Sequence, residues 1–295
     1  MLQGVVDTYI GSLSSGEHNG KNHNTIVAYR NDLYQICLYL EQQGVDDWPQ
    51  VTHEHVAGYL LKMQKDQVYR PTTIARKLAA LKSFVRYLRS REIIALDPTE
   101  KLEPPHVQRE LPQVLSVEQM NSLLSQVEVE TPGGRRDLAV LHLLCATGMR
   151  VTELVSLNLD DIDVVQSTVL CPGGNGRNRR ERLLPLPPLA AEATRQYIET
   201  ARPHLALHHP EEQALFLNHH GERLTRQGFW LIIKGYARQA GIGVITPHML
   251  RNSFAILMLK GGMELRSVQE LLGHANIATT QVYSQLAHVE VAVTG

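Results

Sequence analysis

Arginine and histidine side chains stand at two expected helix boundaries, where they could face an anionic group. Arg150 comes two residues after Gly148, and glycine commonly ends a helix. His248 and Arg251 follow Thr246, and the proline directly after this threonine marks a helix start. Because they are three positions apart, His248 and Arg251 should share one face of the first turns of that helix.

Two further polar side chains stand near the carboxyl end of the chain. Gly273 should end a helix and present His274, and a later threonine can cap a new helix with Tyr283 in its first turn. Taken singly, such residues have ordinary explanations. A helix-start histidine is often a cap, an arginine such as Arg150 often pairs with a carboxylate such as Glu153, and a lone tyrosine usually packs in a core.

Together these side chains match the needs of phosphodiester cleavage. Two fixed guanidiniums, Arg150 and Arg251, can bind the non-bridging oxygens of one phosphate and stabilise the charge of the transition state. A tyrosine hydroxyl has an ordinary pKa of about 10, so it needs a base or a strong field, and histidine titrates in the right range. Attack by Tyr283 would store the broken bond as a phosphotyrosine. Rejoining would then need neither ATP nor a metal ion, so no cofactor is expected.

The elements that must position these residues fall into two parts, separated by a proline-rich segment. Pro104, Pro105 and Pro112 lie within nine residues, which excludes a helix there and indicates an extended linker. We therefore predict a domain over residues 1–101, a linker over 102–112 and a second domain over 113–295.

The first part is expected to be all helical, because its apolar residues recur at three-and-four spacing. One helix is expected over 53–64, and another opens at Pro71. The apolar stripe of the helix before these two consists of Ile26, Tyr29, Leu33, Ile36 and Leu40. The stripe of the helix that opens at Pro71 consists of Ile74, Leu78, Leu81, Val85 and Leu88.

The second part is expected to be mostly helical, with a small antiparallel sheet near its middle. Ser116 is of a residue type that commonly caps the start of a helix, and helices are expected over 136–145 and 152–157. Short strands are expected over 167–171 and 182–186, joined by a glycine-rich basic turn. The predicted fold class is thus mainly α, with an α+β second domain.

Residues 70–91 hold seven lysines and arginines and no acid. Such a run is usually a solvated helix face, but it also suits a surface that follows DNA phosphates. We therefore interpret Arg76, Lys77, Lys82 and Arg86 as DNA-binding candidates.

Composition limits the other classes of function. The formal net charge is −1, so the chain as a whole is not a basic nucleic-acid protein, although local charge matters more. The three cysteines form no CxxC pair, which argues against a disulfide framework or a thiolate zinc site and fits a reducing compartment. The amino terminus does not resemble a secretory signal, and the apolar runs are shorter than the ~20 residues of a membrane span. We expect a soluble protein of the cytoplasm.

Several passages resemble the tyrosine recombinase (lambda-type integrase) family, particularly its Xer-like members. They are, in order along the chain, ATGMRVTEL, GRNRRERLLPLP, HMLRNSFAILMLKGG and LRSVQELLGHANIATTQVYSQL. The resemblance implies a clamp around duplex DNA, in which residues 1–101 form the helical core-binding domain and the rest is catalytic. It also implies a synapse of four protomers, homo- or hetero-tetrameric, on paired sites of double-stranded DNA. Strands would be exchanged through a 3′-phosphotyrosyl intermediate and a Holliday junction.

The same resemblance implies a role for each matched residue. Arg150 and Arg251 would bind the scissile phosphate, His248 would act as base or hydrogen-bond partner, and His274 would be a second phosphate-binding histidine. Tyr283 would be the nucleophile. Glu153 would brace the arginines, and Arg226 and Lys234 lie where the family touches DNA, although ordinary surface charge explains these two equally well.

Two positions depart from the family pattern. Arg177 stands where a lysine normally protonates the leaving 5′-oxygen, and arginine, with a pKa above about 12, is a poor proton donor. Arg177 could act by charge, a neighbour or water could supply the proton, or the register could be wrong. Asn252 stands where many relatives carry histidine, and a minor effect is expected because it can still form hydrogen bonds.

Three alternative functions compete with this interpretation. His204, His208 and His209 could suggest a metal site, but prolines flank them and no HExxH or regular carboxylates accompany them, so no metal is expected. A DNA-binding protein without catalysis is disfavoured by the matching catalytic positions. A type IB topoisomerase shares the chemistry but acts without paired sites. The departures at Arg177 and Asn252 favour mobile-element integration or excision slightly over chromosome-dimer resolution, and the target site is left open.

Overall fold

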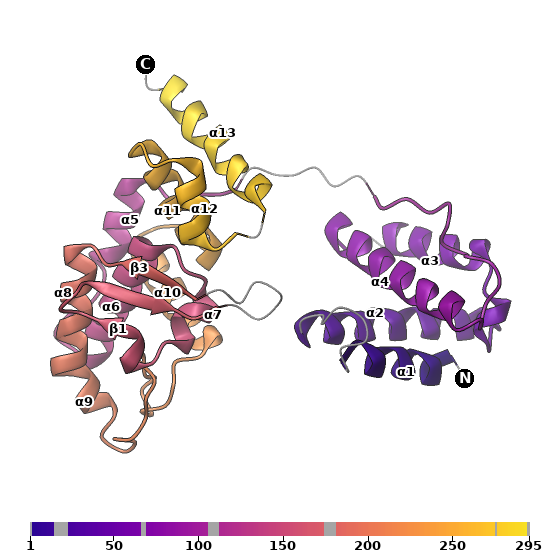
Figure 1. Ribbon diagram of the computed structural model, residues 1–295, viewed down its shortest axis with the longest axis horizontal. Helices are drawn as coiled ribbons and strands as arrows, with labels where there is room; N and C mark the ends of the chain where they lie inside the picture. Colours follow the sequence, from indigo (N-terminus) through magenta and orange to yellow (C-terminus); the bar gives the residue numbers. More distant parts are fainter. Residues whose placement is uncertain are drawn as a thin grey trace. The chain divides into compact units, whose positions relative to one another are not determined.

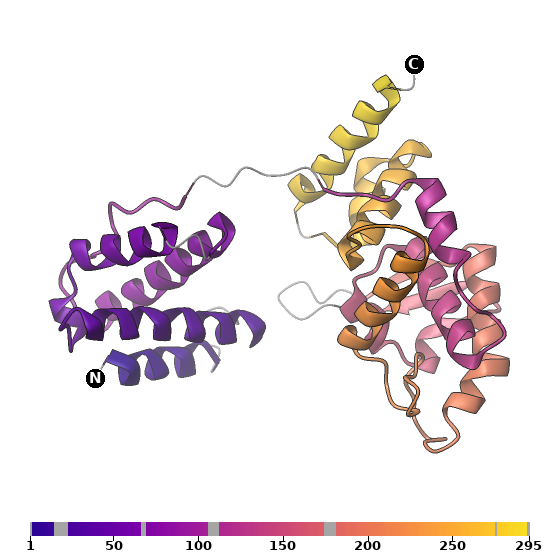
Figure 2. The ribbon, with the colours of Figure 1, turned by 180° about the vertical axis from the view of Figure 1, so that it is seen from behind.

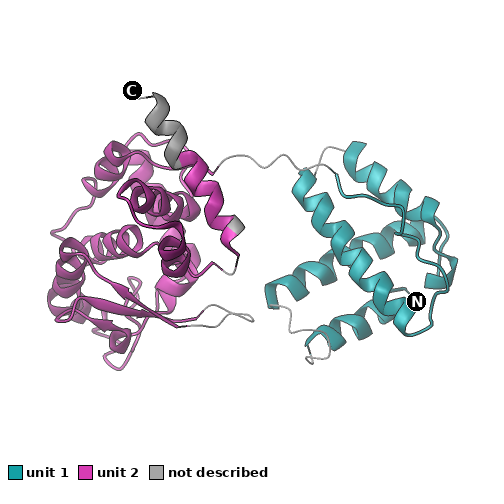
Figure 3. Ribbon diagram, turned by 45° about the horizontal axis from the view of Figure 1, so that its top comes forward, with its two compact units in different colours: residues 1–109 teal, residues 110–295 magenta. Residues whose placement is uncertain are grey.

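The computed structural model describes residues 2–14, 23–65, 69–105, 112–173, 181–274 and 276–293. The chain divides into two compact units, residues 1–109 and 110–295, coloured separately in Figure 3. Residues 106–111, which make up more than half of the predicted linker over 102–112, lie outside the described residues. The described part contains no helix long and apolar enough to cross a membrane.

Unit 1 (residues 1–109) consists of helices packed around one apolar core (Figure 1). Its elements are α1 (Leu2–Ser14), α2 (His23–Gln42), the 3-10 turn η1 (Trp48–Gln50), α3 (His53–Lys65) and α4 (Pro71–Ser90). All five predicted stripe residues of α4 are buried, and three of the five predicted for α2 are buried. The starts of α3 and α4 match the predicted positions, whereas α1 was not predicted as a separate helix.

Unit 2 (residues 110–295) consists mostly of helices and also contains a three-stranded antiparallel sheet. The strands are β1 (Ile162–Asp163), β2 (Thr168–Cys171) and β3 (Arg182–Pro185), in the order β1-β2-β3. The register pairs Val169 with Leu184, and both are buried. The mostly helical fold with a small antiparallel sheet is confirmed, and β1 is an addition to the two predicted strands.

The helices of unit 2 pack around its apolar core, to which the sheet contributes one face. They are α5 (Val117–Leu124), α6 (Pro132–Thr147), α7 (Val151–Ser156), α8 (Pro188–Gln196), α9 (Arg202–Leu205), α10 (Arg226–Gln239), α11 (Pro247–Lys260), α12 (Leu265–Leu272) and α13 (Ile277–Val293). Two short segments, η2 (Leu159–Asp161) and the π-helical η3 (Tyr197–Ala201), complete the unit. The sheet faces the viewer in Figure 1 and α10 faces the viewer in Figure 2, so they lie on opposite faces of the unit.

Helix α6 is the central helix of this core. Its residues Ala139, Leu141, Leu143 and Leu144 have no exposed surface, as expected for a helix covered on several sides. Gly148 ends α6 with a φ of 58°, in the left-handed region that glycine adopts most readily. The chain therefore turns sharply between α6 and α7, and Arg150 lies in this turn.

A second, smaller apolar cluster holds α11, α12 and α13 together. Phe254, Val268, Leu272 and Tyr283 are among its buried members. Figure 1 shows the three helices side by side at one end of the unit. This cluster brings the three predicted carboxyl-terminal site segments into one neighbourhood.

Candidate active site

The start of helix α7 and the start of strand β3 meet at the buried carboxylate of Glu153. Arg150 is the N-cap of α7, and its main-chain N–H donates to Glu153 Oε2 (2.7 Å) while its guanidinium donates to Oε1 (2.9 Å). Arg182, the first residue of β3, donates to both carboxylate oxygens at 3.1 and 2.8 Å. The Glu153 side chain is only 2% exposed. This carboxylate therefore holds Arg150 and Arg182 in fixed positions.

The ionised state of Glu153 is set by these arginines. Burial opposes ionisation, but the hydrogen bonds from Arg182 and from the main chain of Arg150 outweigh it, and the pKa of Glu153 falls to about 2. An anion at this position offsets part of the repulsion between the neighbouring guanidiniums. The contacts of Glu153 with the arginines fit the predicted bracing of these residues. The functional role of Glu153 stays a proposal.

The loop after α12 supplies carbonyl acceptors to the arginines. Gly273 ends α12 with a φ of 62°, and its carbonyl accepts a hydrogen bond from Arg150 (3.1 Å). Arg182 donates to the carbonyl of Leu271 (2.8 Å). A Cβ at Gly273 would lie 3.2 Å from the Arg182 guanidinium, so glycine allows this close approach. The segment that carries His274 is thus fixed to the arginine cluster.

Arg251 is the most deeply placed cation of the site. Its side chain donates to the carbonyls of Gly148 and Leu272, and the residue is 5% exposed. Burial lowers the pKa of Arg251 to about 10, and the positive charge of Arg150 adds to this effect. The chain therefore holds two guanidiniums, those of Arg150 and Arg251, near enough that the charge of Arg150 lowers the pKa of Arg251.

His248 and Arg251 lie in the first turns of α11, as predicted. Thr246 caps this helix by accepting a hydrogen bond from the main-chain N–H of Met249 (3.2 Å). His248 is exposed at the surface of the site. Burial of part of its ring lowers the pKa of His248, and the positive charges of Arg251, Arg226 and Arg150 lower it further. His248 is thus neutral at pH 7 and can take a proton.

His274 and Tyr283 pack against each other with ring centroids 6.2 Å apart and planes 26° apart. His274 Nδ1 lies 3.0 Å from the hydroxyl of Thr280, which is itself buried. Burial and then the charge of Arg251 lower the pKa of His274 to about 4, so the ring is neutral near pH 7. The structure therefore brings His274 and Tyr283 into direct contact.

The hydroxyl of Tyr283 contacts a residue for which only a minor effect was expected. It donates a hydrogen bond to Asn252 Oδ1 (2.9 Å), and Tyr283 is 6% exposed. Burial raises the pKa of Tyr283, while the charges of Arg251 and Arg150 act in the opposite direction. These effects place the phenol within electrostatic reach of both arginines. The helix α13 begins at Ile277, so Tyr283 lies in its second turn, and the prediction of the first turn was wrong.

The remaining predicted residues of unit 2 are Arg177 and the two cations of α10. Arg226 and Lys234 are exposed on α10, and Arg226 lies near enough to His248 to lower its pKa. Arg177 lies outside the described residues. Within the described part of the chain, no group of histidine, cysteine, aspartate or glutamate side chains is placed to hold a metal ion. Sequence reasoning missed Arg182, which appeared there only as the first residue of the expected strand over 182–186.

The basic face of α4 is divided between buried and exposed cations. Lys77 was expected to contact DNA, but it is 5% exposed and donates to Asp32 (2.9 Å) and Gln35, so this expectation needs correction. Arg76 is partly exposed and pairs with the same Asp32. Lys77 lies on the buried side of α4 together with Ile74, Leu78 and Leu81, and the buried carboxylate of Asp32 compensates its charge. Lys77 is therefore a structural residue of unit 1.

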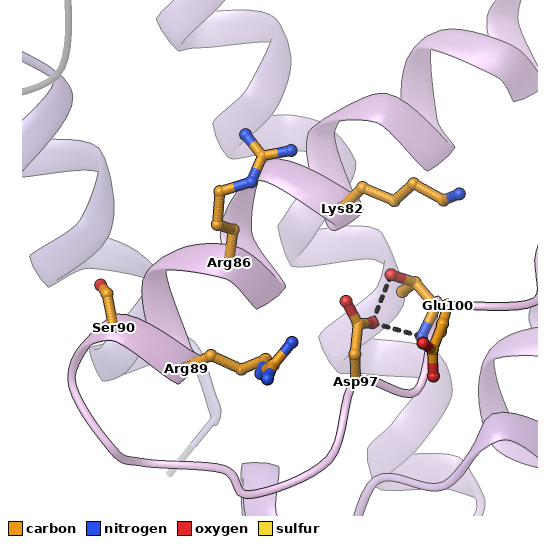
Figure 4. A pocket seen from close by; sticks show the side chains of 7 residues that line it. Lys82, Arg86, Arg89, Ser90, Asp97 and Glu100 are labelled. Atoms are coloured by element: carbon orange, nitrogen blue, oxygen red, sulfur yellow. Dashed lines mark hydrogen bonds between the residues drawn. The ribbon is translucent and has the colours of Figure 1, made fainter.

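Three cations of α4, the half-buried Lys82 and the exposed Arg86 and Arg89, line a hollow in unit 1. This hollow has a volume of about 520 Å³ and is lined by Lys82, Arg86, Arg89, Ser90, Asp97, Thr99 and Glu100. Figure 4 shows Arg86 directed away from Asp97 and Glu100, and Arg89 on their side of the hollow. Asp97 accepts hydrogen bonds from Thr99 at 2.7 and 2.6 Å, which holds this carboxylate in the loop. The predicted candidates Lys82 and Arg86 are thus available at the surface.

Comparison with family models assigns both parts of the chain. Residues 113–290 match the model described as "Phage integrase family", and residues 17–92 match "Phage integrase, N-terminal SAM-like domain". The chain is 47% identical over 271 residues to tyrosine recombinase XerC of Roseiflexus sp. (strain RS-1), covering 91% of this chain and 85% of the relative. It is 41% identical over 269 residues to tyrosine recombinase XerD of Listeria innocua, covering 90% and 89%.

Solved structures share the fold at low sequence identity. A crystal structure of XerH site-specific recombinase bound to a palindromic difH substrate, a post-cleavage complex, matches with a TM-score of 0.74 and 18% identity, covering 99% of this chain and 95% of that one. A lambda integrase dimer bound to a COC′ core site matches with a TM-score of 0.73 and 15% identity, covering 96% and 94%. These likenesses support the fold assignment made from the helices and the sheet.

Proposed function

This chain belongs to the phage integrase family of tyrosine recombinases, and from that premise we propose that it breaks and rejoins duplex DNA at specific sites. The observation that carries the proposal is the meeting of Arg150, Arg251, His274 and Tyr283 around the loop after α12. Two guanidiniums, a neutral imidazole and a phenol in one neighbourhood suit the transfer of a phosphoryl group from one oxygen to another.

In the proposed reaction Arg150 and Arg251 bind the non-bridging oxygens of the scissile phosphate. Tyr283 Oη attacks the phosphorus, the bond to the 5′-oxygen breaks, and a 3′-phosphotyrosine forms while the 5′-oxygen takes up a proton. The reverse step, with the 5′-hydroxyl of another strand as nucleophile, rejoins the DNA. Because the phosphotyrosine retains the energy of the broken bond, neither ATP nor a metal ion is consumed.

Proton transfer needs a base for the phenol and an acid for the leaving oxygen. His248 is neutral at pH 7 because burial and the charges of Arg251, Arg226 and Arg150 lower its pKa, so it is our candidate for the base. Arg177 is the candidate for stabilising the leaving 5′-oxygen by charge. We further propose that the half-buried Lys82 and the exposed cations Arg86, Arg226 and Lys234 bind the DNA backbone.

We also propose that four protomers, identical or of two kinds, exchange strands between paired sites through a Holliday junction. The activity would then serve integration, excision or dimer resolution of DNA in the cytoplasm, in association with the nucleoid. A type IB topoisomerase would relax supercoiled DNA without paired sites. Relaxation of a plasmid that carries no selected site, at a rate equal to that of a plasmid with two sites, would favour that alternative.

The test is the trapping of a covalent adduct. A site is first selected from a randomised duplex pool by binding to the full chain, and a nick is then placed next to it so that the released fragment cannot be rejoined. The wild-type chain should form a protein–DNA adduct that survives denaturation, and Tyr283→Phe should form none while binding the same duplex. An adduct that persists in Tyr283→Phe would contradict the nucleophile, and no adduct in the wild type would contradict the proposed reaction.

A further inference from the structure

A chain of two hydrogen bonds connects the Tyr283 hydroxyl to the main chain that follows the linker. Tyr283 Oη donates to Asn252 Oδ1 (2.9 Å), and Asn252 Nδ2 donates to the carbonyl of Gln113 (3.1 Å). Gln113 lies 139 positions before Asn252 in the sequence, and Asn252 lies 31 positions before Tyr283. One side chain therefore joins three distant segments of unit 2.

The orientation of the Asn252 amide follows from these two contacts. A carbonyl oxygen can only accept, so the Gln113 carbonyl requires the NH₂ group of Asn252 to face it. The Oδ1 atom is then left to face Tyr283, where it can only accept the phenolic proton. A flip of the amide would oppose two oxygens at Gln113, so the acceptor is held toward the phenol.

The segment around Gln113 is itself fixed to α11. The main-chain N–H of Leu115 donates to Ser253 Oγ (2.7 Å), and Ser253 in turn donates to the carbonyl of Met249 (2.8 Å). Leu115 and Ser253 are both buried. The support of Asn252 is therefore a rigid part of the core, as positioning of a reactive group requires.

Asn252 can hold the hydroxyl but cannot remove its proton, because an amide oxygen is not a base near neutral pH. From these contacts we infer that Asn252 is a positioning residue for Tyr283, holding its hydroxyl oxygen in a fixed place, with the Gln113 carbonyl fixing the amide. This inference rests on the proposed function, in which Tyr283 is the nucleophile. The proton must leave to a different group, which is His248 in the proposed reaction, while the charges of Arg251 and Arg150 act on the phenol and the ring of His274 packs against it.

The chemistry of this position identifies the substitutions that test it. Asn252→Ala removes both hydrogen bonds. Asn252→His can restore both, because a neutral imidazole donates through one ring nitrogen and accepts through the other. Asn121→Ala makes the same truncation at an exposed position of α5 and serves as the matched control.

The first measurement is the single-turnover rate of adduct formation on the nicked duplex, beside duplex affinity and thermal unfolding. Asn252→Ala should lower the rate about tenfold, the effect of one net hydrogen bond, with duplex affinity changed less than about twofold. Asn252→His should recover most of the rate above pH 7. It should lose that rate as the pH falls below about 6.5, because an imidazolium cannot accept the phenolic proton. The wild-type amide does not titrate and should lack this pH-dependent loss.

The second measurement needs neither DNA nor catalysis. With tyrosine labelled at Cζ and the Tyr283 signal assigned through Tyr283→Phe, NMR follows the ionisation of this phenol in the free protein. Donation to Asn252 stabilises the neutral phenol, so Asn252→Ala should lower the pKa of Tyr283, and Asn121→Ala should leave it unchanged.

The outcomes separate this inference from the proposed function. An unchanged Tyr283 titration and an unchanged adduct rate in Asn252→Ala would overturn the positioning role. An Asn252→His variant no faster than Asn252→Ala at any pH would overturn it as well, as would parallel losses of rate, affinity and stability in Asn252→Ala. Failure of the wild type to form any adduct would refute the proposed reaction instead, while the NMR titration would still report on the contact with Asn252.

Discussion

Arg182 binds Glu153 at two points, with its terminal nitrogens 3.1 and 2.8 Å from the two carboxylate oxygens. Arg182 belongs to β3 and Glu153 to α7, and the two residues are 29 positions apart in the sequence. Arg150 binds the same carboxylate, so one buried anion connects the sheet to the turn that carries a proposed phosphate ligand. The sheet of unit 2 therefore contributes the side chain of Arg182 to the proposed active site, besides supporting the fold of the unit.

Replacing Glu153 by glutamine should destabilise unit 2 by about 3 kcal/mol, because removal of one partner leaves buried guanidinium charge uncompensated. The folded-state pKa of Glu153 is lowered to about 2 from 4.5. Its contribution to stability is therefore present above about pH 4.5 and is lost as the pH falls toward about 2. Denaturant unfolding at several pH values measures both effects, and Glu153→Gln should lack this part of the acid-induced loss.

The matched control for Glu153→Gln is Glu192→Gln. Glu192 pairs with Arg195 on α8, where both side chains are more than 40% exposed. Such surface pairs contribute about 0–1 kcal/mol, so this variant should unfold nearly as the wild type does. Equal effects of the two substitutions would contradict the bracing role of Glu153.

His274 should bind protons more tightly when DNA is present than when it is absent. Burial and the charge of Arg251 hold its pKa at about 4 in the free protein, and a phosphate at Arg251 and Arg150 would offset those positive charges. Histidine NMR signals, with His274 assigned through His274→Gln, should give a higher pKa in the complex with a selected duplex. An unchanged pKa in the complex would argue against a phosphate next to this ring.

The same pKa has a consequence for stability. Because the folded-state value lies below the ordinary 6.5, the stability due to neutral His274 is present above pH 6.5. It is lost as the pH falls from 6.5 toward about 4. His274→Gln should remove this contribution to the pH dependence of unfolding between those values.

Helix starts, helix ends and apolar stripes are the features that could be predicted from the sequence by local rules. Pro71, Ser116 and Thr246 act as starts or caps, and Gly148 and Gly273 act as ends, because each rule depends on the conformation of only a few neighbouring residues. The apolar stripe of α4 was predicted for the same reason. These local features allowed the segments of Arg150, Arg251 and His274 to be placed at helix boundaries.

Contacts between distant segments could not be predicted in this way. Nothing in the run of cations over residues 70–91 reveals that Asp32, 45 positions before Lys77, is buried and binds it. The bonds of Asn252 to Gln113 and Tyr283 likewise depend on how α11, α13 and the segment after the linker pack. Such pairings follow from tertiary structure, which periodicity and capping do not specify.

Lys77 and Arg86 should respond oppositely to substitution, although both belong to the basic face of α4. Lys77→Met leaves Asp32 with one partner fewer in a buried environment and should cost about 3 kcal/mol of stability. Arg86 is exposed, so Arg86→Ala should leave stability nearly unchanged. It should weaken duplex binding and reduce the salt dependence of log K by about one unit of slope. Weaker binding with an unchanged slope would exclude a phosphate contact at Arg86.

Gly148→Ala should strongly destabilise unit 2. Its φ of 58° is strained for alanine, and the new Cβ would lie 2.3 Å from Phe254 and 2.9 Å from Leu272. Gly241→Ala is the matched control, because Gly241 has a φ of 66° but no atom within 4 Å of a new Cβ. We expect a loss of about 1 kcal/mol for Gly241→Ala from backbone strain, and about 3 kcal/mol for Gly148→Ala, where overpacking is added. Thermal unfolding measures the difference.

Because the Gly148 carbonyl accepts a hydrogen bond from Arg251, adduct formation by Gly148→Ala should fall even at temperatures where the variant is folded, whereas Gly241→Ala should keep the wild-type rate.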